Sequence, residues 1–130
     1  MTQTPKRFDI ASATDVGRVR AHNEDSLAAD ASLGVAVLAD GMGGYNAGEV
    51  ASGIAVAMAP AEFKDLAARN ALTGLSEGAV EKVVGDLASK INTSIYTAAQ
   101  SQSQYAGMGT TLVIAYWHGD RVAKIGRAHV

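Results

Sequence analysis

Apolar and polar residues follow two different spacings along this chain, and the change from one to the other predicts its elements. Towards both ends of the chain the apolar residues alternate or form short runs, as in β-strands. A tight connection near Ala31-Ser32 and the turn sequence His118-Gly119-Asp120 predict two hairpins. We therefore expect strands at residues 8–13, 26–30, 33–40, 110–117 and 121–123.

In the middle of the chain, apolar residues recur at the three- and four-residue spacing of a helix that buries one face. The first such stripe begins at Ala47, and Pro60 predicts its end because proline cannot donate the helical hydrogen bond. Residues 61–76 are mixed, with Gly74 as a breaker, and a longer stripe runs from Val80 to Ala98. Antiparallel strands covered by helices indicate an α+β fold.

Composition narrows the class of protein. The 130 residues suffice for one domain with a hydrophobic core, and 48% of them are apolar. Lysine and arginine are neither clustered nor in excess, which disfavours a nucleic-acid partner. No apolar run approaches the ~20 residues that span a bilayer, so no membrane partner is expected in this segment. The start lacks a signal-peptide core and cysteine is absent, which fits a cytoplasmic protein and excludes a cysteine nucleophile.

A carboxylate followed by three glycines within four positions stands at the end of the strand expected at 33–40. Asp40-Gly41-Met42-Gly43-Gly44 places a negative charge at a strand tip beside peptide carbonyls, which suits a hard divalent cation. A plain turn is the alternative, because Asp-Gly is a common turn pair. Nucleotide-binding and calcium-loop patterns fail, since Asn46 occupies the last glycine position of GxGxxG and Met42 stands where a calcium ligand is required.

Further charged residues precede the hairpin. Glu24 and Asp25 follow Arg20 by a few positions. Because adjacent residues of an extended strand point to opposite faces, only one of the two carboxylates can face a given site directly. Arg20 adds a planar, permanently charged group that matches a carboxylate or a phosphate. Taken alone, this segment is more typical of an ordinary charged loop.

Together, the two segments resemble the opening signature of a known family. The pattern GxxRxxNEDs, followed by an apolar strand and ADGMGG, is similar to that of the bacterial metal-dependent protein serine/threonine phosphatases, the protein phosphatase 2C or PPM family. Thr14-Asp15-Val16-Gly17 and the segment Gly107–Leu112, which contains a GTT sequence, also fit. The resemblance covers about residues 8–123. It implies an α-β-β-α sandwich of two antiparallel sheets flanked by helices, of which this chain holds the amino-terminal portion.

The resemblance also implies a reaction, a cofactor and a partner. Phosphoserine and phosphothreonine of phosphorylated protein substrates would be hydrolysed by a water that two Mn²⁺ or Mg²⁺ ions activate, about 3.5–4 Å apart. Asp40 would be the catalytic residue that bridges the ions. The Gly41 carbonyl and Glu24 would bind one of them, with Asp25 beside it. Arg20 would bind the substrate phosphate.

Some positions depart from the family pattern. Met42 stands where many relatives carry a histidine that is credited as the proton donor to the leaving group. In this chain, the proton for the leaving group must therefore come from water or elsewhere. His22 is the nearest alternative, but we expect it to be exposed or capping, and we expect His118 to face solvent. The family domain is about twice as long and supplies further aspartates, whereas no acidic residue follows Asp120. The isolated chain is therefore expected to be inactive. A non-catalytic phosphatase-like module that binds a metal or a partner is the alternative.

The last seven residues differ from the family ending. Where the family continues as G-D-S-R, Gly126 aligns but Arg127 takes the place of the aspartate. The sequence Lys-Ile-Gly-Arg-Ala-His-Val is also what the start of a widely used sequencing adapter encodes. We hypothesise that residues 124–130 are not native and that residues 1–123 are the amino-terminal part of one phosphatase catalytic domain.

Resequencing of the locus tests this hypothesis. We expect the reading frame to continue after Gly126 with Asp-Ser-Arg, because that is the ending that the resemblance implies. A genomic stop codon directly after Val130 would contradict it.

Overall fold

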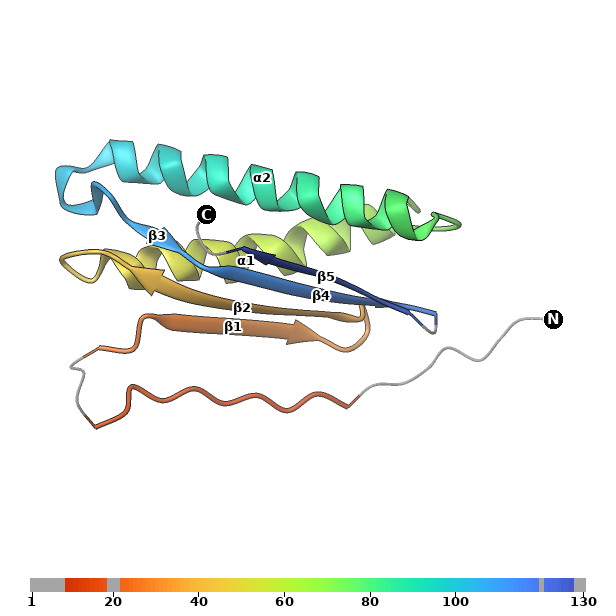
Figure 1. Ribbon diagram of the computed structural model, residues 1–130, viewed down its shortest axis with the longest axis horizontal. Helices are drawn as coiled ribbons and strands as arrows, with labels where there is room; N and C mark the ends of the chain where they lie inside the picture. Colours follow the sequence, from red (N-terminus) through yellow and green to blue (C-terminus); the bar gives the residue numbers. More distant parts are fainter. Residues whose placement is uncertain (1–8, 19–21, 120, 128–130) are drawn as a thin grey trace.

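The computed structural model describes residues 9–18, 22–119 and 121–127, which form an antiparallel sheet with two long helices on one of its faces (Figure 1). The order across the sheet is β1-β2-β4-β5, and the short strand β3 pairs with the end of β2. This architecture confirms the expected α+β class. The elements are β1 (Asp25–Asp30), β2 (Val35–Met42), α1 (Ala47–Ala68), α2 (Glu77–Ser101), the 3-10 turn η1 (Ser103–Tyr105), β3 (Gly109–Thr110), β4 (Leu112–His118) and β5 (Arg121–Arg127).

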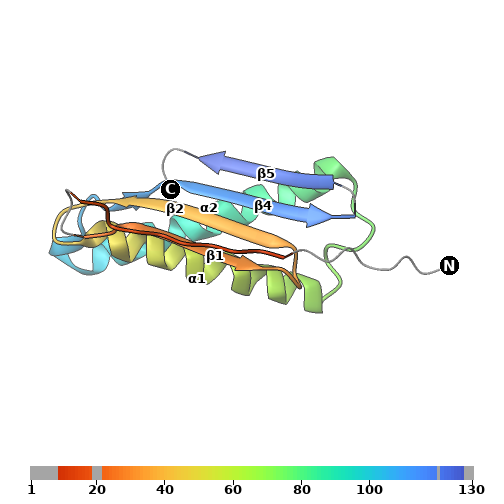
Figure 2. The same ribbon diagram turned by 90° about the horizontal axis from the view of Figure 1, so that it is seen from below.

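The two faces of the sheet have different surroundings. Val35, Val37 and Ala39 of β2 are buried against the helices, whereas Leu38 on the other face is 50% exposed. Figures 1 and 2 show α1 and α2 on one side of the sheet and residues 9–18 running along the other. We call this second side the open face. A groove of about 240 Å³ lies there, lined by residues 10–12 and by small or apolar residues of β1, β2 and β4.

Helix α1 does not end at Pro60, so the expected helix end is wrong. The helix continues to Ala68 with Pro60 inside it. Ala55, Ala59 and Phe63 are all fully buried, and the Phe63 ring lies 5.1 Å from the ring of Tyr116 on β4. This packing carries the buried stripe across the proline and outweighs its cost of about 3 kcal/mol within a helix.

Two other expectations are corrected by the structure. Residues 9–13 form no strand; they lie along the open face, and neither edge strand, β1 or β5, pairs with them. Phe8, the expected first residue of that strand, lies outside the described residues. His118 does not face solvent, because β4 extends to include it and its ring stacks on Tyr116 with the ring centres 5.5 Å apart. Its Nε2 atom is buried and has no hydrogen-bond partner among the described residues.

Helix α2 confirms the longer predicted stripe, and its first turn is fixed at the end of the sheet where β4 meets β5. The Ser76 hydroxyl accepts a hydrogen bond of 3.2 Å from the Ala79 N–H, which caps the helix. An Arg121 nitrogen of β5 lies 2.7 Å from a Glu77 carboxylate oxygen. This Arg121 contact holds the pKa of Glu77 below its usual value. In the described part of the chain, no helix combines the length and the apolar character needed to cross a membrane.

The Phe63→Ala substitution tests the helix–sheet core. We expect the free energy of unfolding to fall by about 3–5 kcal/mol, because the substitution empties a fully buried ring position. Tyr96→Ala is the matched control, since that ring is 65% exposed on α2. Urea unfolding measures both variants. A loss for Phe63→Ala no larger than that for Tyr96→Ala would contradict the packing described.

Candidate metal centre

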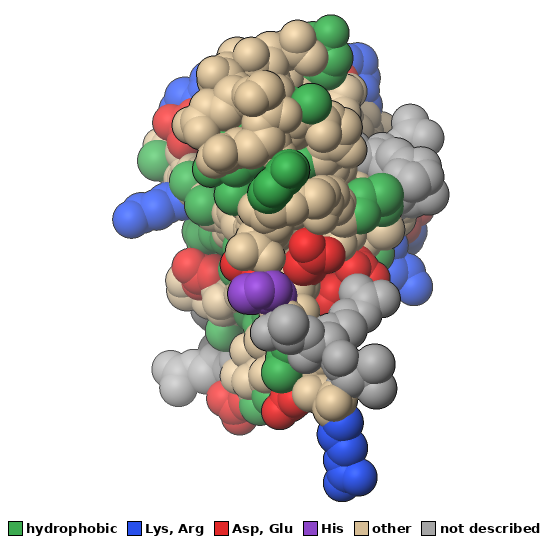
Figure 3. All heavy atoms as spheres, turned by 90° about the vertical axis from the view of Figure 1, so that its left-hand side faces the viewer, with side chains coloured by type: hydrophobic (Ala, Val, Ile, Leu, Met, Phe, Trp, Pro, Cys, Tyr) green, Lys and Arg blue, Asp and Glu red, His purple; other side chains and the backbone are tan. Residues whose placement is uncertain are grey.

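Two carboxylates meet where β1 begins and β2 ends. The register places Asp25 directly opposite Asp40 on the neighbouring antiparallel strand. Side chains of residues so paired lie on the same face, with Cβ atoms about 4.5–5.5 Å apart, and like charges in this arrangement repel. Figure 3 shows acidic side chains gathered around a histidine at this end of the molecule. The pair Asp25 and Asp40 therefore brings two carboxylates together on the open face, and carboxylate oxygens suit a hard divalent cation.

Glu24, one residue before β1, joins three elements through its main-chain carbonyl oxygen. This oxygen accepts a hydrogen bond of 3.0 Å from the Gly41 N–H and one of 2.7 Å from the Ser52 hydroxyl of α1. Ser52 is fully buried, and its hydroxyl oxygen also lies 3.1 Å from the hydroxyl oxygen of Ser26. The start of β1, the end of β2 and the first turns of α1 are thereby fixed relative to one another.

Two glycines allow β2 and α1 to touch. A Cβ atom on Gly41 would lie 1.9 Å from the Gly48 carbonyl oxygen, and a Cβ atom on Gly48 would lie 2.8 Å from the Glu24 carboxyl carbon. Both distances are too short for any side chain. The main chain of the strand tip therefore lies directly against the helix, and the Glu24 side chain extends across Gly48.

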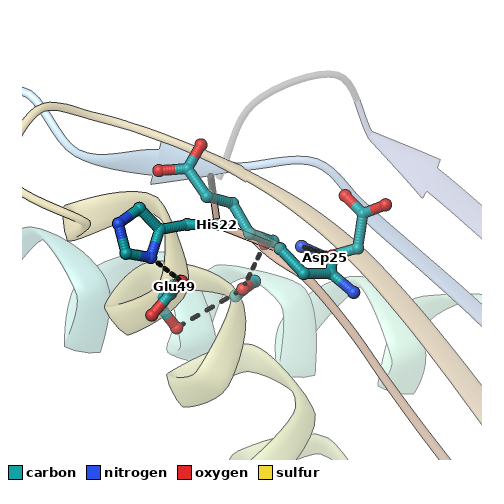
Figure 4. A network of polar contacts seen from close by, with 6 residues as sticks. His22, Asp25 and Glu49 are labelled. Carbon is teal, nitrogen blue, oxygen red and sulfur yellow. Dashed lines mark hydrogen bonds and ion pairs between the residues drawn. The ribbon is translucent and has the colours of Figure 1, made fainter. Parts of the chain in front are cut away.

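His22 and Glu49 lie beside this corner. The His22 Nδ1 atom is 3.6 Å from a Glu49 carboxylate oxygen, and the two side chains are 55% and 41% exposed. Figure 4 shows these two side chains directed towards each other, while Asp25 is directed away from them. His22 was expected to be exposed or capping, and its exposed side chain agrees with the first of these.

The expected site residues are thus partly assembled. Asp25 and Asp40 are opposite each other, and Glu24 and Gly41 share a hydrogen bond, while Arg20 lies outside the described residues. Among the described residues there is no group of three or more histidine, cysteine, aspartate or glutamate side chains placed to hold a metal ion. Of the expected site residues, the described part of the chain therefore brings together the carboxylates of Asp25 and Asp40 and the main chains of Glu24 and Gly41.

Residues that sequence reasoning missed support this corner. Asn23 accepts a hydrogen bond of 3.0 Å from the Asp25 N–H and donates one of 2.8 Å to the Thr14 hydroxyl. Gly48 and Ser52 lie one helical turn apart on the buried side of α1. A glycine and a hydroxyl at that spacing, within a stripe of buried alanines, were the available signal for a helix that approaches a strand closely.

Comparison with known proteins identifies the family. Residues 17–126 match the family described as protein phosphatase 2C. The chain belongs to the protein phosphatase 2C family. The serine/threonine phosphatase stp of Listeria monocytogenes is 36% identical over 105 residues, a match that covers 78% of this chain and 40% of the relative. The serine/threonine protein phosphatase PstP of Mycobacterium tuberculosis is 36% identical over 122 residues, which cover 88% of this chain and 20% of the relative.

Solved structures of relatives share the fold. The catalytic domain of PstP in complex with two manganese ions matches with a TM-score of 0.68 and 33% identity, over 85% of this chain and 43% of that structure. Stp1 from Staphylococcus aureus matches with a TM-score of 0.68 and 30% identity, over 86% of this chain and 43% of that structure. The chain therefore spans less than half the length of these relatives, and its sheet and helical layer correspond to a part of their fold.

Two glycine substitutions in α1 test the close contact of strand and helix. Gly48→Ala should lower the free energy of unfolding by about 1–3 kcal/mol, because its methyl group would overlap main-chain atoms of Gly41 and Met42. Gly53→Ala is the matched control, since its methyl group would meet nothing within 4 Å. That control should raise stability by about 0.5–1 kcal/mol, the helical preference for alanine over glycine. Thermal unfolding distinguishes the two, and equal effects would argue against the contact.

Proposed function

We propose that this chain is the amino-terminal part of a metal-dependent protein serine/threonine phosphatase. In this proposal, Glu24, Asp25, Asp40 and the Gly41 carbonyl contribute ligands for Mn²⁺ or Mg²⁺. The observation that carries the proposal is the direct pairing of Asp25 with Asp40 at the tip of two strands. The manganese-bound structure of the related PstP domain supports the choice of metal.

The residues present fit such ions chemically. Carboxylate and peptide oxygens are the ligands that Mg²⁺ and Mn²⁺ prefer, and the chain contains no cysteine. Gly41 carries no side chain to cover its own carbonyl group, and its main chain is held by the hydrogen bond from its N–H to Glu24. Asp25 and Asp40 carry like charges on neighbouring strands, so a cation bound between them would reduce their mutual repulsion.

The proposed substrates are phosphoserine and phosphothreonine side chains of proteins. When bound, the metal ions supply a water that loses its proton near neutral pH and is aimed at phosphorus. Arg20, with its planar charged group, would bind the phosphate oxygens. Asp40 would hold the ions at the strand tip, and its position depends on the strand pairing described above.

We further propose that the isolated chain does not hydrolyse phosphate esters. The family domain that the chain resembles supplies further aspartates after the segment matched here, and no acidic residue follows Asp120 in this chain. The alternative function is a non-catalytic phosphatase-like module that binds a metal or a partner.

A chimaera distinguishes the two functions. Residues 17–126 of this chain would replace the matching segment of the Listeria monocytogenes phosphatase, and Mn²⁺-dependent hydrolysis of a phosphothreonine peptide would be measured. We expect activity in the chimaera and background rates for the isolated chain. Asp40→Asn should lower the rate more than about 100-fold, since losing even an outer partner of a ligand costs about 10–100-fold.

Asp86→Asn serves as the matched control for this assay. Asp86 is an exposed aspartate of α2 that pairs with Lys82 at 3.0 Å, so its loss should leave the rate unchanged. A chimaera that unfolds cooperatively but hydrolyses nothing would favour the non-catalytic module. Metal-dependent turnover by the isolated chain would show that the further carboxylates are not needed.

A further inference from the structure

Thr111 stands opposite Asp40 on the other side of β2 from Asp25. Leu38 pairs with Val113 and Gly41 pairs with Thr110, so the register continues through the gap between β3 and β4. The Thr111 N–H donates a hydrogen bond of 2.8 Å to the Asp40 carbonyl oxygen. This is one half of an ordinary antiparallel pair.

The other half of the pair is replaced by a side chain. In a regular ladder, the Asp40 N–H would donate to the Thr111 carbonyl oxygen. Here it donates instead to the Thr111 hydroxyl, at 3.0 Å. The Thr111 carbonyl oxygen accepts a hydrogen bond of 2.8 Å from the hydroxyl of Thr110, whose side chain is fully buried. A hydroxyl has therefore taken the place of a main-chain acceptor beside a carboxylate of the candidate metal centre.

The main chain around Asp40 is consequently fixed from both neighbouring strands. On the β4 side, Thr111 accepts from the Asp40 N–H and donates to its carbonyl oxygen. On the β1 side, the next N–H, that of Gly41, donates to the Glu24 carbonyl oxygen. Of these three hydrogen bonds, only the one to the Thr111 hydroxyl involves a side chain, so a substitution of Thr111 removes this bond and keeps the donors and acceptors of the other two.

We propose that Thr111 is a positioning residue that sets where the Asp40 carboxylate stands for a divalent cation. This inference rests on the proposed function. Without the hydroxyl, the Asp40 N–H either loses its acceptor or turns to the Thr111 carbonyl oxygen, as in a regular ladder. Either change moves the main chain that carries the Asp40 side chain. Because outer partners orient the ligands of a metal, their loss weakens metal binding.

Manganese binding to the chain tests the proposal, with free Mn²⁺ measured by electron paramagnetic resonance. Thr111→Val should weaken binding about 10- to 100-fold, the usual cost of losing an outer partner. Thr111→Ser keeps the hydroxyl and should bind like the unsubstituted chain. Ser76→Ala is the matched control, because it also removes a hydroxyl that accepts from a main-chain N–H, but at the opposite end of the sheet (Figure 1). Its affinity for Mn²⁺ should not change.

Hydrogen exchange of the Asp40 amide provides a second measurement that needs no metal. We expect faster exchange in Thr111→Val and protection in Thr111→Ser and Ser76→Ala, because only the first removes the acceptor. Thr111→Ala, which also removes the hydroxyl, replaces Thr111→Val if the latter does not fold. A protected Asp40 amide together with unchanged Mn²⁺ affinity in the valine or alanine variant would overturn the proposal.

The experiment separates failure of this inference from failure of the proposed function. If the unsubstituted chain and the Asp40→Asn variant bind Mn²⁺ equally, the proposed metal centre is wrong. The proposed role of Thr111 in positioning a metal ligand is then wrong as well. If Asp40→Asn abolishes binding but Thr111→Val does not, the metal centre stands and the role of Thr111 is wrong. Loss of affinity in both variants, with recovery in Thr111→Ser, supports both.

Discussion

The carbonyl oxygen of Glu24 accepts two hydrogen bonds, one from the Gly41 main chain and one from the Ser52 hydroxyl, and the candidate centre depends on this junction. It ties the loop before β1 to the strand and to the helix that follow. The junction requires two positions without side chains, Gly41 and Gly48, because any Cβ atom there would overlap the opposite main chain. The Asp25–Asp40 pair occupies the other face of the same strand tip. Main-chain geometry on the helical side thus determines carboxylate geometry on the open face.

Much of the fold follows from periodicity alone, since the hairpin of β1 and β2 and the long helix α2 agree with the spacing of their apolar residues. The predicted helix end at Pro60 was wrong because the tendency of proline to end a helix was outweighed by tertiary packing. Phe63 and the alanines before the proline bury one continuous stripe, and that burial exceeds the local cost. Residues 9–13 show the reverse case, since a loose apolar alternation finds no strand partner in the described part of the chain.

The candidate centre was predictable where its residues are close in sequence and followed a known pattern. Adjacent carboxylates on a strand must diverge, and Glu24 and Asp25 do so, with Asp25 facing Asp40 and Glu24 crossing Gly48. The supporting hydroxyls were not predictable, because their partners are remote. Ser52 bonds a residue 28 positions away, and Thr111 bonds one 71 positions away. The three-dimensional structure is needed to show which hydroxyl forms a hydrogen bond with which main-chain group.

The Asp40-Gly41 bond has a consequence for covalent stability. In flexible chains, an aspartate before glycine is prone to isomerise, because the glycine nitrogen can attack the aspartate carboxyl group and form a cyclic imide. In the folded chain that nitrogen donates its hydrogen to Glu24, and Gly41 is enclosed by the main chain of α1. Ring closure would require the peptide to rotate out of both contacts. Folding therefore protects the carboxylate on which the centre depends from chemical ageing, and prolonged unfolding exposes it to isoaspartate formation.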